Sequence, residues 1–264
     1  MKKTCIILAV IAVLIGATTA FAGPAIDKVL QKGELVVGTS GDYPPFNVKT
    51  KDGRLIGFDV DLATGIAASM GVKPKIIQVP FADLLSSLES GKIDMIISAM
   101  TMTPKRNLKV AFVGPYFVSG QAVLTTKETS FKATTIQDIN KPDFTLIVPA
   151  GTTSEIIAKD YLSRAKLIVA KNMDEAMKAL LAGKAKAILT DSATAAVATF
   201  RYMEKGIVST SALTFEPIGI AVQGNDPLFT NFLENLLGSL KGGGELNIMV
   251  DKWFKDPSWV KDLP

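Results

Sequence analysis

The sequence predicts an α/β protein built from two similar lobes, because three of its features agree. Short apolar runs alternate with amphipathic segments, which is typical of parallel strands joined by helices. The segment LESGKIDMIIS (88–98) aligns without gaps with LLAGKAKAILT (180–190). Two extended segments, 120–126 and 215–226, lie where the chain would pass from one lobe to the other and back.

The first 22 residues have the features of a secretory signal peptide. A basic MKK precedes the uncharged apolar run CIILAVIAVLIGA, and AFA supplies small residues for the −3 and −1 positions of a cleavage site. We expect cleavage after Ala22. An uncleaved membrane anchor is the alternative, but the apolar run is shorter than the ~20 residues that a spanning helix needs. The sequence therefore predicts a periplasmic protein.

The composition of the exported part excludes several kinds of function. The chain has no histidine, and its single cysteine, Cys5, lies in the leader. Disulfides, thiol catalysis and histidine ligands for zinc are therefore absent, and we expect neither a metal nor a cofactor. The formal net charge of +4 includes Lys2 and Lys3 of the leader, and the small remainder argues against nucleic-acid binding.

The first lobe is expected to alternate three strands with two helices. The strands are the short apolar runs at 34–39, 75–80 and 93–98. Residues 57–71 repeat an apolar side chain every four positions and end at a glycine, which predicts a helix. Residues 81–91 predict the second helix.

The second lobe repeats this order. Strands are expected at 144–149, 165–170 and 184–190, and each is followed by a helical segment, namely 151–162, 172–183 and 191–203.

Two crossings between the lobes define the expected domains. The amphipathic helix that begins at residue 227 and is stopped by the glycines at 242–244 returns to the first lobe. The expected division is a signal peptide at 1–22, lobe 1 at 23–123 and 217–264, and lobe 2 at 124–216. Two crossing strands side by side would form a hinge.

Ligands of open parallel sheets bind beyond the carboxyl ends of the strands, so the residues that follow each strand are candidates. The first strand is followed by TSGDYPPFN. Pro44 and Pro45 are expected to hold this loop extended. We expect Tyr43 to face a ligand and Phe46 to be a core aromatic.

The stretch SAMTMTPKRN follows the third strand. Thr103 and Pro104 fit the N-cap and first position of a short helix, which places Arg106 in its first turn. A cation there opposes the helix dipole. A ligand carboxylate held by the guanidinium would compensate, with the hydroxyls of Ser98 and Thr101 sharing the anion. A surface arginine paired with a neighbouring acid is the alternative.

The second lobe offers a similar set of polar groups. VPAGTTSEI predicts a helix start whose free N–H groups favour an anion, and Thr152 and Thr153 add hydroxyls. Glu155 has capping-box spacing from Thr152, so we expect it to close the helix rather than act as a catalytic acid. Asp191 either caps the next helix or faces a ligand's ammonium group. Arg106 and Asp191, on separate lobes, would together hold both charges of an α-amino acid.

These motifs resemble the family 3 extracellular solute-binding proteins, in particular the polar-amino-acid receptors of ABC importers. The resemblance covers nearly all of the mature chain through GTSGDYPPF, GFDVDLA, SGKIDMIISAMTMTPKR, PYF, GTTSE, AILTDSA and IGIAV. It implies the type II periplasmic binding protein fold, with two α/β lobes joined by two crossover strands that close on a ligand. The implied partners are an amino acid and a membrane ABC permease, and we expect a monomer.

The family pattern also implies residue roles. Arg106 matches the residue that binds the α-carboxylate, and Asp191 matches the partner of the α-ammonium group. Tyr43 and Phe81 match aromatic residues that flank the ligand side chain in some members. The positions that assist at the carboxylate are Ala99, Thr101, Thr152 and Thr153.

Three positions keep the ligand's identity open. Basic- and glutamine-binding members often carry an aspartate where this chain has Ser40, and Asp42 lies two residues further on. The glutamine receptor has a lysine where Pro149 stands.

Two other functions remain as alternatives. Cyclohexadienyl (prephenate/arogenate) dehydratases resemble GDYPPF and GTTSE as well, and there a glutamate matching Glu155 would act as general acid. A sensory module that docks to a membrane kinase or chemoreceptor is the third possibility.

Overall fold

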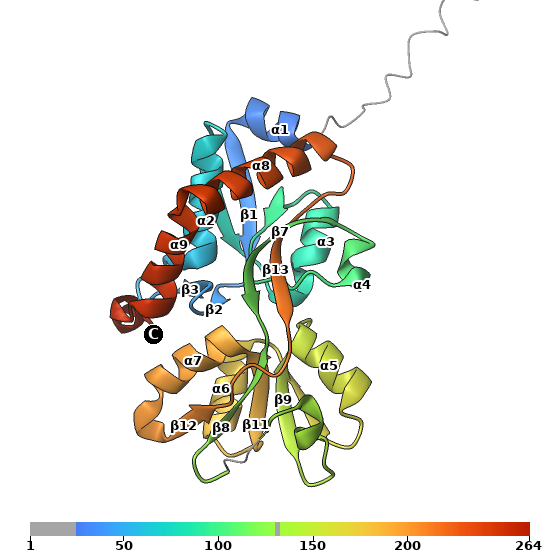
Figure 1. Cartoon of the computed structure of the whole chain (residues 1–264), viewed down its shortest axis with the longest axis vertical. Helices are drawn as coiled ribbons and strands as arrows, with labels where there is room; N and C mark the ends of the chain where they lie inside the picture. Colours follow the sequence, from blue (N-terminus) through green and yellow to red (C-terminus); the bar gives the residue numbers. More distant parts are fainter. Residues whose placement is uncertain (1–24, 130–132) are drawn as a thin grey trace, which may run out of the picture.

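The computed structural model describes residues 25–129 and 133–264. The expected signal peptide and its cleavage site lie outside these residues. Within them, two five-stranded sheets lie one above the other, each with its own helices, and a small three-stranded sheet lies near their junction (Figure 1). No described helix is both long and apolar enough to cross a membrane.

The first sheet has the strand order β5–β1–β6–β13–β7. β1 pairs in parallel with β5 and β6, as the strand–helix alternation predicts, whereas β13 is antiparallel to β6 and β7. Its strands are β1 (Glu34–Thr39), β5 (Lys73–Gln78), β6 (Met95–Ile96), β7 (Ala111–Ser119) and β13 (Glu216–Val222).

The second sheet has the order β10–β9–β11–β8–β12 and, like the first, combines parallel with antiparallel pairs. β9 is parallel to β10 and β11, and β8 is antiparallel to β11 and β12. Its strands are β8 (Gln121–Thr126), β9 (Thr145–Pro149), β10 (Lys166–Ala170), β11 (Ala187–Asp191) and β12 (Ile207–Ser209).

The sequence repeat falls on equivalent places in the two sheets. Segment 88–98 contains β6 and segment 180–190 leads into β11, each the third strand in its sheet's order. Each strand follows a turn with a glycine in the left-handed region, Gly91 at φ 71° and Gly183 at φ 68°. The repeat therefore reflects two copies of one strand–helix arrangement.

Helices cover both faces of each sheet. In the first lobe they are α1 (Ala25–Lys32), α2 (Phe58–Ser69), η1 (Phe81–Asp83), α3 (Leu84–Glu89), α4 (Pro104–Asn107), α8 (Pro227–Gly243), α9 (Glu245–Val250), η4 (Asp251–Lys255) and η5 (Ser258–Asp262). In the second lobe they are η2 (Ile136–Ile139), α5 (Thr153–Tyr161), α6 (Met173–Leu181), α7 (Ser192–Arg201) and η3 (Met203–Lys205).

The buried apolar residues alternate between the two faces of each sheet. In β1, Leu35 and Val37 pack with α2 and α8, whereas Val36 packs with α3 on the opposite face. In β9, Ile147 faces α6 and α7, and Leu146 faces α5. The central parallel strands β1 and β9 are thus buried on both faces, which explains why they are continuous apolar runs.

The chain passes between the sheets twice. β7 belongs to the first sheet and β8 to the second, so the first passage lies at Gly120. The second lies between β12 and β13, and β7 and β13 run side by side through the junction (Figure 1). The backbones touch there: a Cβ built on Gly120 would lie 1.9 Å from the carbonyl oxygen of Thr214.

Three local details differ from the sequence expectations. Residues 42–49 form the antiparallel strands β2 (Asp42–Tyr43) and β3 (Asn47–Lys49), which are completed by β4 (Leu55–Ile56). Pro44 and Pro45 therefore lie in a tight turn rather than an extended loop. α8 continues through Gly242 and Gly243 and ends only at Gly244, at φ 90°. Glycine costs helix stability but does not forbid a helix when the chain packs well.

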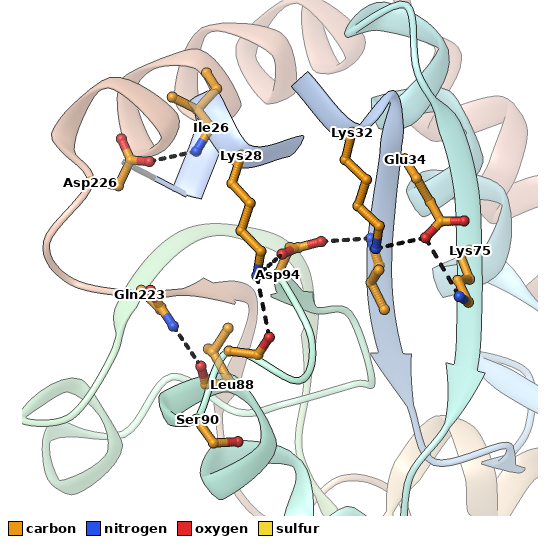
Figure 2. A network of polar contacts seen from close by, with 12 residues as sticks. Ile26, Lys28, Lys32, Glu34, Lys75, Leu88, Ser90, Asp94, Gln223 and Asp226 are labelled. Atoms are coloured by element: carbon orange, nitrogen blue, oxygen red, sulfur yellow. Dashed lines mark hydrogen bonds and ion pairs between the residues drawn. The ribbon is translucent and has the colours of Figure 1, made fainter. Parts of the chain in front are cut away.

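A polar network fixes the end of the first sheet that lies farthest from the second lobe (Figure 2). Asp226 accepts a hydrogen bond from the Ile26 N–H at 2.8 Å, which ties α1 to the start of α8. The Asp94 carboxylate lies 3.7 Å from the Lys28 ammonium and accepts from the Val36 N–H at 2.9 Å. These contacts anchor α1 and lie apart from the cavity described next.

Candidate functional site

A cavity of about 370 Å³ lies between the two sheets, at the carboxyl ends of their parallel strands. Residues of both lobes and both crossing segments line it. They are Ser40, Asp42, Tyr43, Gln78, Pro80, Phe81, Ala99, Thr101, Arg106, Gln121, Pro149, Ala150, Thr152, Thr153, Lys171, Asn172, Asp174, Asp191 and Glu216. Eight of the nine residues predicted from the sequence are among them.

Arg106 lies in the first turn of α4, as predicted, and the Thr103 side chain caps that helix by accepting from the Arg106 N–H. The side chain is buried, with 5% exposure. Its Nη1 donates to the Thr101 carbonyl at 2.8 Å, and its Nη2 donates to the Gly151 carbonyl of the other lobe at 3.0 Å. Burial lowers the pKa of Arg106 to about 10 while the Glu216 carboxylate acts to raise it, so the group stays cationic at neutral pH.

Arg106 has no carboxylate partner within ion-pair distance among residues 25–129 and 133–264. The structure thus gives no support to the alternative of a surface arginine paired with a neighbouring acid. A buried guanidinium bonded to two carbonyls remains positively charged and suits an anion in the cavity.

Asp191 ends β11 and caps α7, since its Oδ1 accepts from the Ala193 N–H at 2.8 Å. It is also buried, with 3% exposure, and lines the same cavity as Arg106. Burial raises its pKa to about 6, with the nearby Glu216 carboxylate adding to the rise. Capping α7 therefore does not remove Asp191 from the cavity lining.

Glu216 is a buried cavity residue that the sequence reasoning missed. It begins β13 in the second crossing segment and accepts hydrogen bonds from the hydroxyls of Thr101 and Thr153, at 3.0 and 2.9 Å. Gln121, in the first crossing segment, donates to its other oxygen at 3.0 Å. An acidic residue that opens the apolar run EPIGIAV was the available signal.

The two predicted aromatic residues flank the cavity from the first lobe. The Tyr43 hydroxyl accepts from the Asp191 N–H at 3.0 Å and lies 2.9 Å from the Thr190 hydroxyl, so it contacts the second lobe. Its pKa is raised, first by burial and then by the Asp191 charge. The Phe81 ring lies against Arg106, with 5.5 Å from the ring centroid to Cζ.

The remaining predicted residues form hydrogen bonds within their own lobes. Ser98 is fully buried outside the lining, where its hydroxyl accepts from the Ser40 N–H at 2.9 Å. Ala99 lines the cavity at a left-handed φ of 47°, but its N–H donates to Asp59 at 2.9 Å. The Thr152 hydroxyl donates to the Pro149 carbonyl at 2.7 Å and caps α5.

Glu155 holds the start of α5, but it binds the Gly151 N–H rather than the Thr152 N–H that a capping box would use. One carboxylate oxygen accepts from the Gly151 N–H at 2.6 Å and the other binds Lys159, also at 2.6 Å. Burial acts to raise its pKa, but these hydrogen bonds outweigh it and hold the pKa below its ordinary value. Glu155 does not line the cavity.

Several contacts join the lobes directly across the cavity rim. The Asp42 carboxylate accepts from the Met173 N–H in the first turn of α6, at 2.9 Å. Gly151, at φ 75°, approaches η1 so closely that a Cβ on it would lie 2.8 Å from the Cα of Ala82. The lobes are therefore closed on one another around the cavity.

The chain belongs to the bacterial extracellular solute-binding proteins, family 3, because the model of that family matches residues 35–256. This agrees with the type II periplasmic binding fold and with the cavity between two lobes.

Individual relatives are similar over most of the chain. The chain is 26% identical over 252 residues to the cyclohexadienyl dehydratase of Pseudomonas aeruginosa, covering 94% of this chain and 92% of the relative. It is 30% identical over 232 residues to the L-arginine-binding protein of the same species, covering 83% and 86%. A solved ABC-transporter binding component from Wolinella succinogenes, complexed with lysine, has a TM-score of 0.83 and 37% identity, covering 87% of this chain and 99% of that one.

Proposed function

We propose that this protein binds an amino acid between its two lobes and delivers it to an ABC permease. One observation carries the proposal: Arg106 and Asp191, of opposite charge and each at least 95% buried, come from different lobes and line one cavity. An α-amino acid would pair with both groups and offset the cost of burying them.

The closed arrangement supports a specific order of events. The ligand binds first to the lobe that carries Arg106, with its carboxylate at the guanidinium. Asp191 and the start of α5 then close over it and the ammonium group pairs with Asp191. Because a ligand shifts an equilibrium only through contacts that are better in one state, these second-lobe contacts would select the closed form. The permease would recognise that form.

The residue roles follow from the same arrangement. Tyr43 and Phe81 would flank the ligand side chain. Thr101 and Thr153 would act mainly by holding Glu216, since both hydroxyls donate to it. Ser98 would support the loop at Ser40 rather than touch the ligand.

Sheet membership supports lobe boundaries close to the expected ones. We place the division at Gly120 and within residues 210–215, which assigns β8 entirely to the second lobe. Family membership implies a protein that acts outside the cytoplasm. Cleavage after Ala22 and a monomeric state complete the proposal, and mass spectrometry and light scattering of the exported protein would check them.

A thermal-shift screen against the twenty amino acids, ornithine and small dicarboxylates tests the function. At 100 times its dissociation constant a true ligand stabilises the folded state by about 2.7 kcal/mol. A protein that responds to none of these compounds would overturn the proposal.

A dehydratase of the cyclohexadienyl type is the alternative, because one relative over 94% of the chain has that activity. The position of Glu155 argues against it, since a carboxylate with a lowered pKa outside the cavity is a poor general acid. Incubation with prephenate should yield no phenylpyruvate, and turnover would favour the enzyme.

A further inference from the structure

The lining of the cavity carries more negative than positive side chains. Its four carboxylates face two cations, and these residues are Asp42, Asp174, Asp191, Glu216, Arg106 and Lys171. Within the described residues, none of the four carboxylates forms an ion pair with a lysine or arginine. Confined carboxylates without cationic partners are costly, so a ligand that supplies positive charge is favoured.

Apart from Lys171, these charges fall into two groups. Arg106 and Glu216 both bond to Thr101. Asp191 is the strand partner of Gln121, which donates to Glu216, so these three charges lie together near the crossing segments. Asp42 and Asp174 form the other group and also line an adjoining cavity of about 190 Å³. They therefore mark the boundary between the two cavities.

The second group is assembled from both lobes. Asp42 lies on β2 of the first lobe and Asp174 in the first turn of α6 of the second. The hydrogen bond from the Met173 N–H to Asp42 brings the two together when the lobes are closed. Burial, with a further contribution from the Asp174 charge, raises the pKa of Asp42. A cation placed here would relieve that repulsion and link the lobes.

We propose, resting on the function proposed above, that the ligand is an amino acid with a cationic side chain, whose distal charge lies between Asp42 and Asp174. The α-carboxylate would pair with Arg106 and the α-ammonium group with Asp191, so a zwitterion leaves Asp42 and Asp174 without an ion pair. Lysine, ornithine and arginine supply it. Glutamine and glutamate do not.

Arginine and citrulline provide the sharpest comparison, because citrulline has nearly the same shape but a neutral end group. Isothermal titration calorimetry of the mature protein at pH 7.5 should give at least tenfold tighter binding of arginine than of citrulline. The double variant Asp42→Asn/Asp174→Asn should reduce that ratio below threefold, mainly because arginine binds more weakly. Asparagine keeps an acceptor for the Met173 N–H, so closure is retained. Asp160→Asn removes one carboxylate at an exposed position on α5, away from the cavity, and should leave the ratio unchanged.

The possible outcomes distinguish a failure of this inference from a failure of the proposed amino-acid-binding function. Equal affinity for arginine and citrulline, or a preference for a neutral amino acid, overturns the cationic ligand and leaves an amino-acid receptor standing. Wild-type selectivity that survives in the double variant overturns the assignment of Asp42 and Asp174. Binding of no amino acid at all overturns the proposed function itself.

Discussion

At the scale of single residues, the main feature of the cavity is that charged side chains are buried in its lining. Arg106 donates to two carbonyl groups, one from each lobe, yet no carboxylate of the described residues lies within ion-pair distance of it. Asp191 caps α7 through one carboxylate oxygen and also lines the cavity. Such groups are stabilised when a ligand of complementary charge replaces the lost water.

Removing the guanidinium should weaken ligand binding strongly. We expect Arg106→Ala to cost about 3–5 kcal/mol, because the ligand carboxylate would be buried without its partner. Arg106→Lys keeps the charge but loses the planar fork, so its loss should be smaller. Calorimetry with the ligand from the screen measures both, and Arg164→Ala, an exposed arginine, is the control. Near-normal affinity in Arg106→Ala would remove Arg106 from the site.

Affinity should also depend on pH through Asp191. Its pKa of about 6 means that the carboxyl group is largely protonated at pH 5 and ionised at pH 7. Only the ionised form pairs with an ammonium group, so binding expels the proton and strengthens as pH rises through 6. We expect affinity to fall about tenfold from pH 7 to pH 5. Asp191→Asn should bind weakly with a flatter profile. A constant wild-type affinity over this range would contradict the assignment.

At the scale of elements, the site is built from the segments that follow strands. The turn after β9 carries Gly151 against η1 of the other lobe, and the loop after β6 carries Arg106 on α4. The side chains of Asp42 and Tyr43, on β2, accept hydrogen bonds from backbone N–H groups of the second lobe. The closed position of the lobes is therefore set by short segments that contact the other lobe closely through backbone atoms.

Gly151→Ala should hinder closure more than it disturbs folding. Its Cβ would collide with Ala82 of the other lobe. Gly183 has a similar left-handed φ, but a Cβ added there would have no atom within 4 Å. Both variants should lose about 1–2 kcal/mol of folding stability, because a residue with a Cβ is strained at this φ. Only Gly151→Ala should weaken ligand binding, by roughly tenfold or more, and shift small-angle scattering toward an open form. Equal affinities in the two variants would show that this contact does not limit closure.

At the scale of the whole molecule, two sheets of similar topology are joined by two adjacent crossing segments. The segments are tied by the hydrogen bonds Gln121 N–H to Thr214 Oγ1, at 2.8 Å, and Leu213 N–H to the Gln121 carbonyl, at 2.7 Å. Glu216 then links this junction to hydroxyls of both lobes. The crossing segments are therefore connected by hydrogen bonds to cavity residues of both lobes.

The junction should be intolerant of added volume. Gly120→Ala places a Cβ 1.9 Å from the Thr214 carbonyl, so the crossing segments must separate. We expect urea denaturation to show a loss of about 1–3 kcal/mol. Gly65→Ala, in α2 with nothing within 4 Å, should instead gain up to about 1 kcal/mol. Unchanged stability in Gly120→Ala would mean that the crossing backbones can part freely.

The sequence by itself determined the two-lobe α/β plan and the position of most of its regular elements, because apolar periodicity and strand-end chemistry are local properties. β1 has the expected limits, and the N-cap at Thr103 and the burial of Phe46 were readable from neighbouring residues. The small β2–β3–β4 sheet was not predicted, since its strands are only two or three residues long.

Only the tertiary structure decided which polar residues share the cavity. It placed Glu216 and Gln121 in the lining from segments 95 residues apart, and it left Ser98 behind that lining. It also brought Asp42 to α6, 131 residues away from it in sequence. These contacts depend on how two separately packed lobes close, and no local pattern of residues encodes the distance between them.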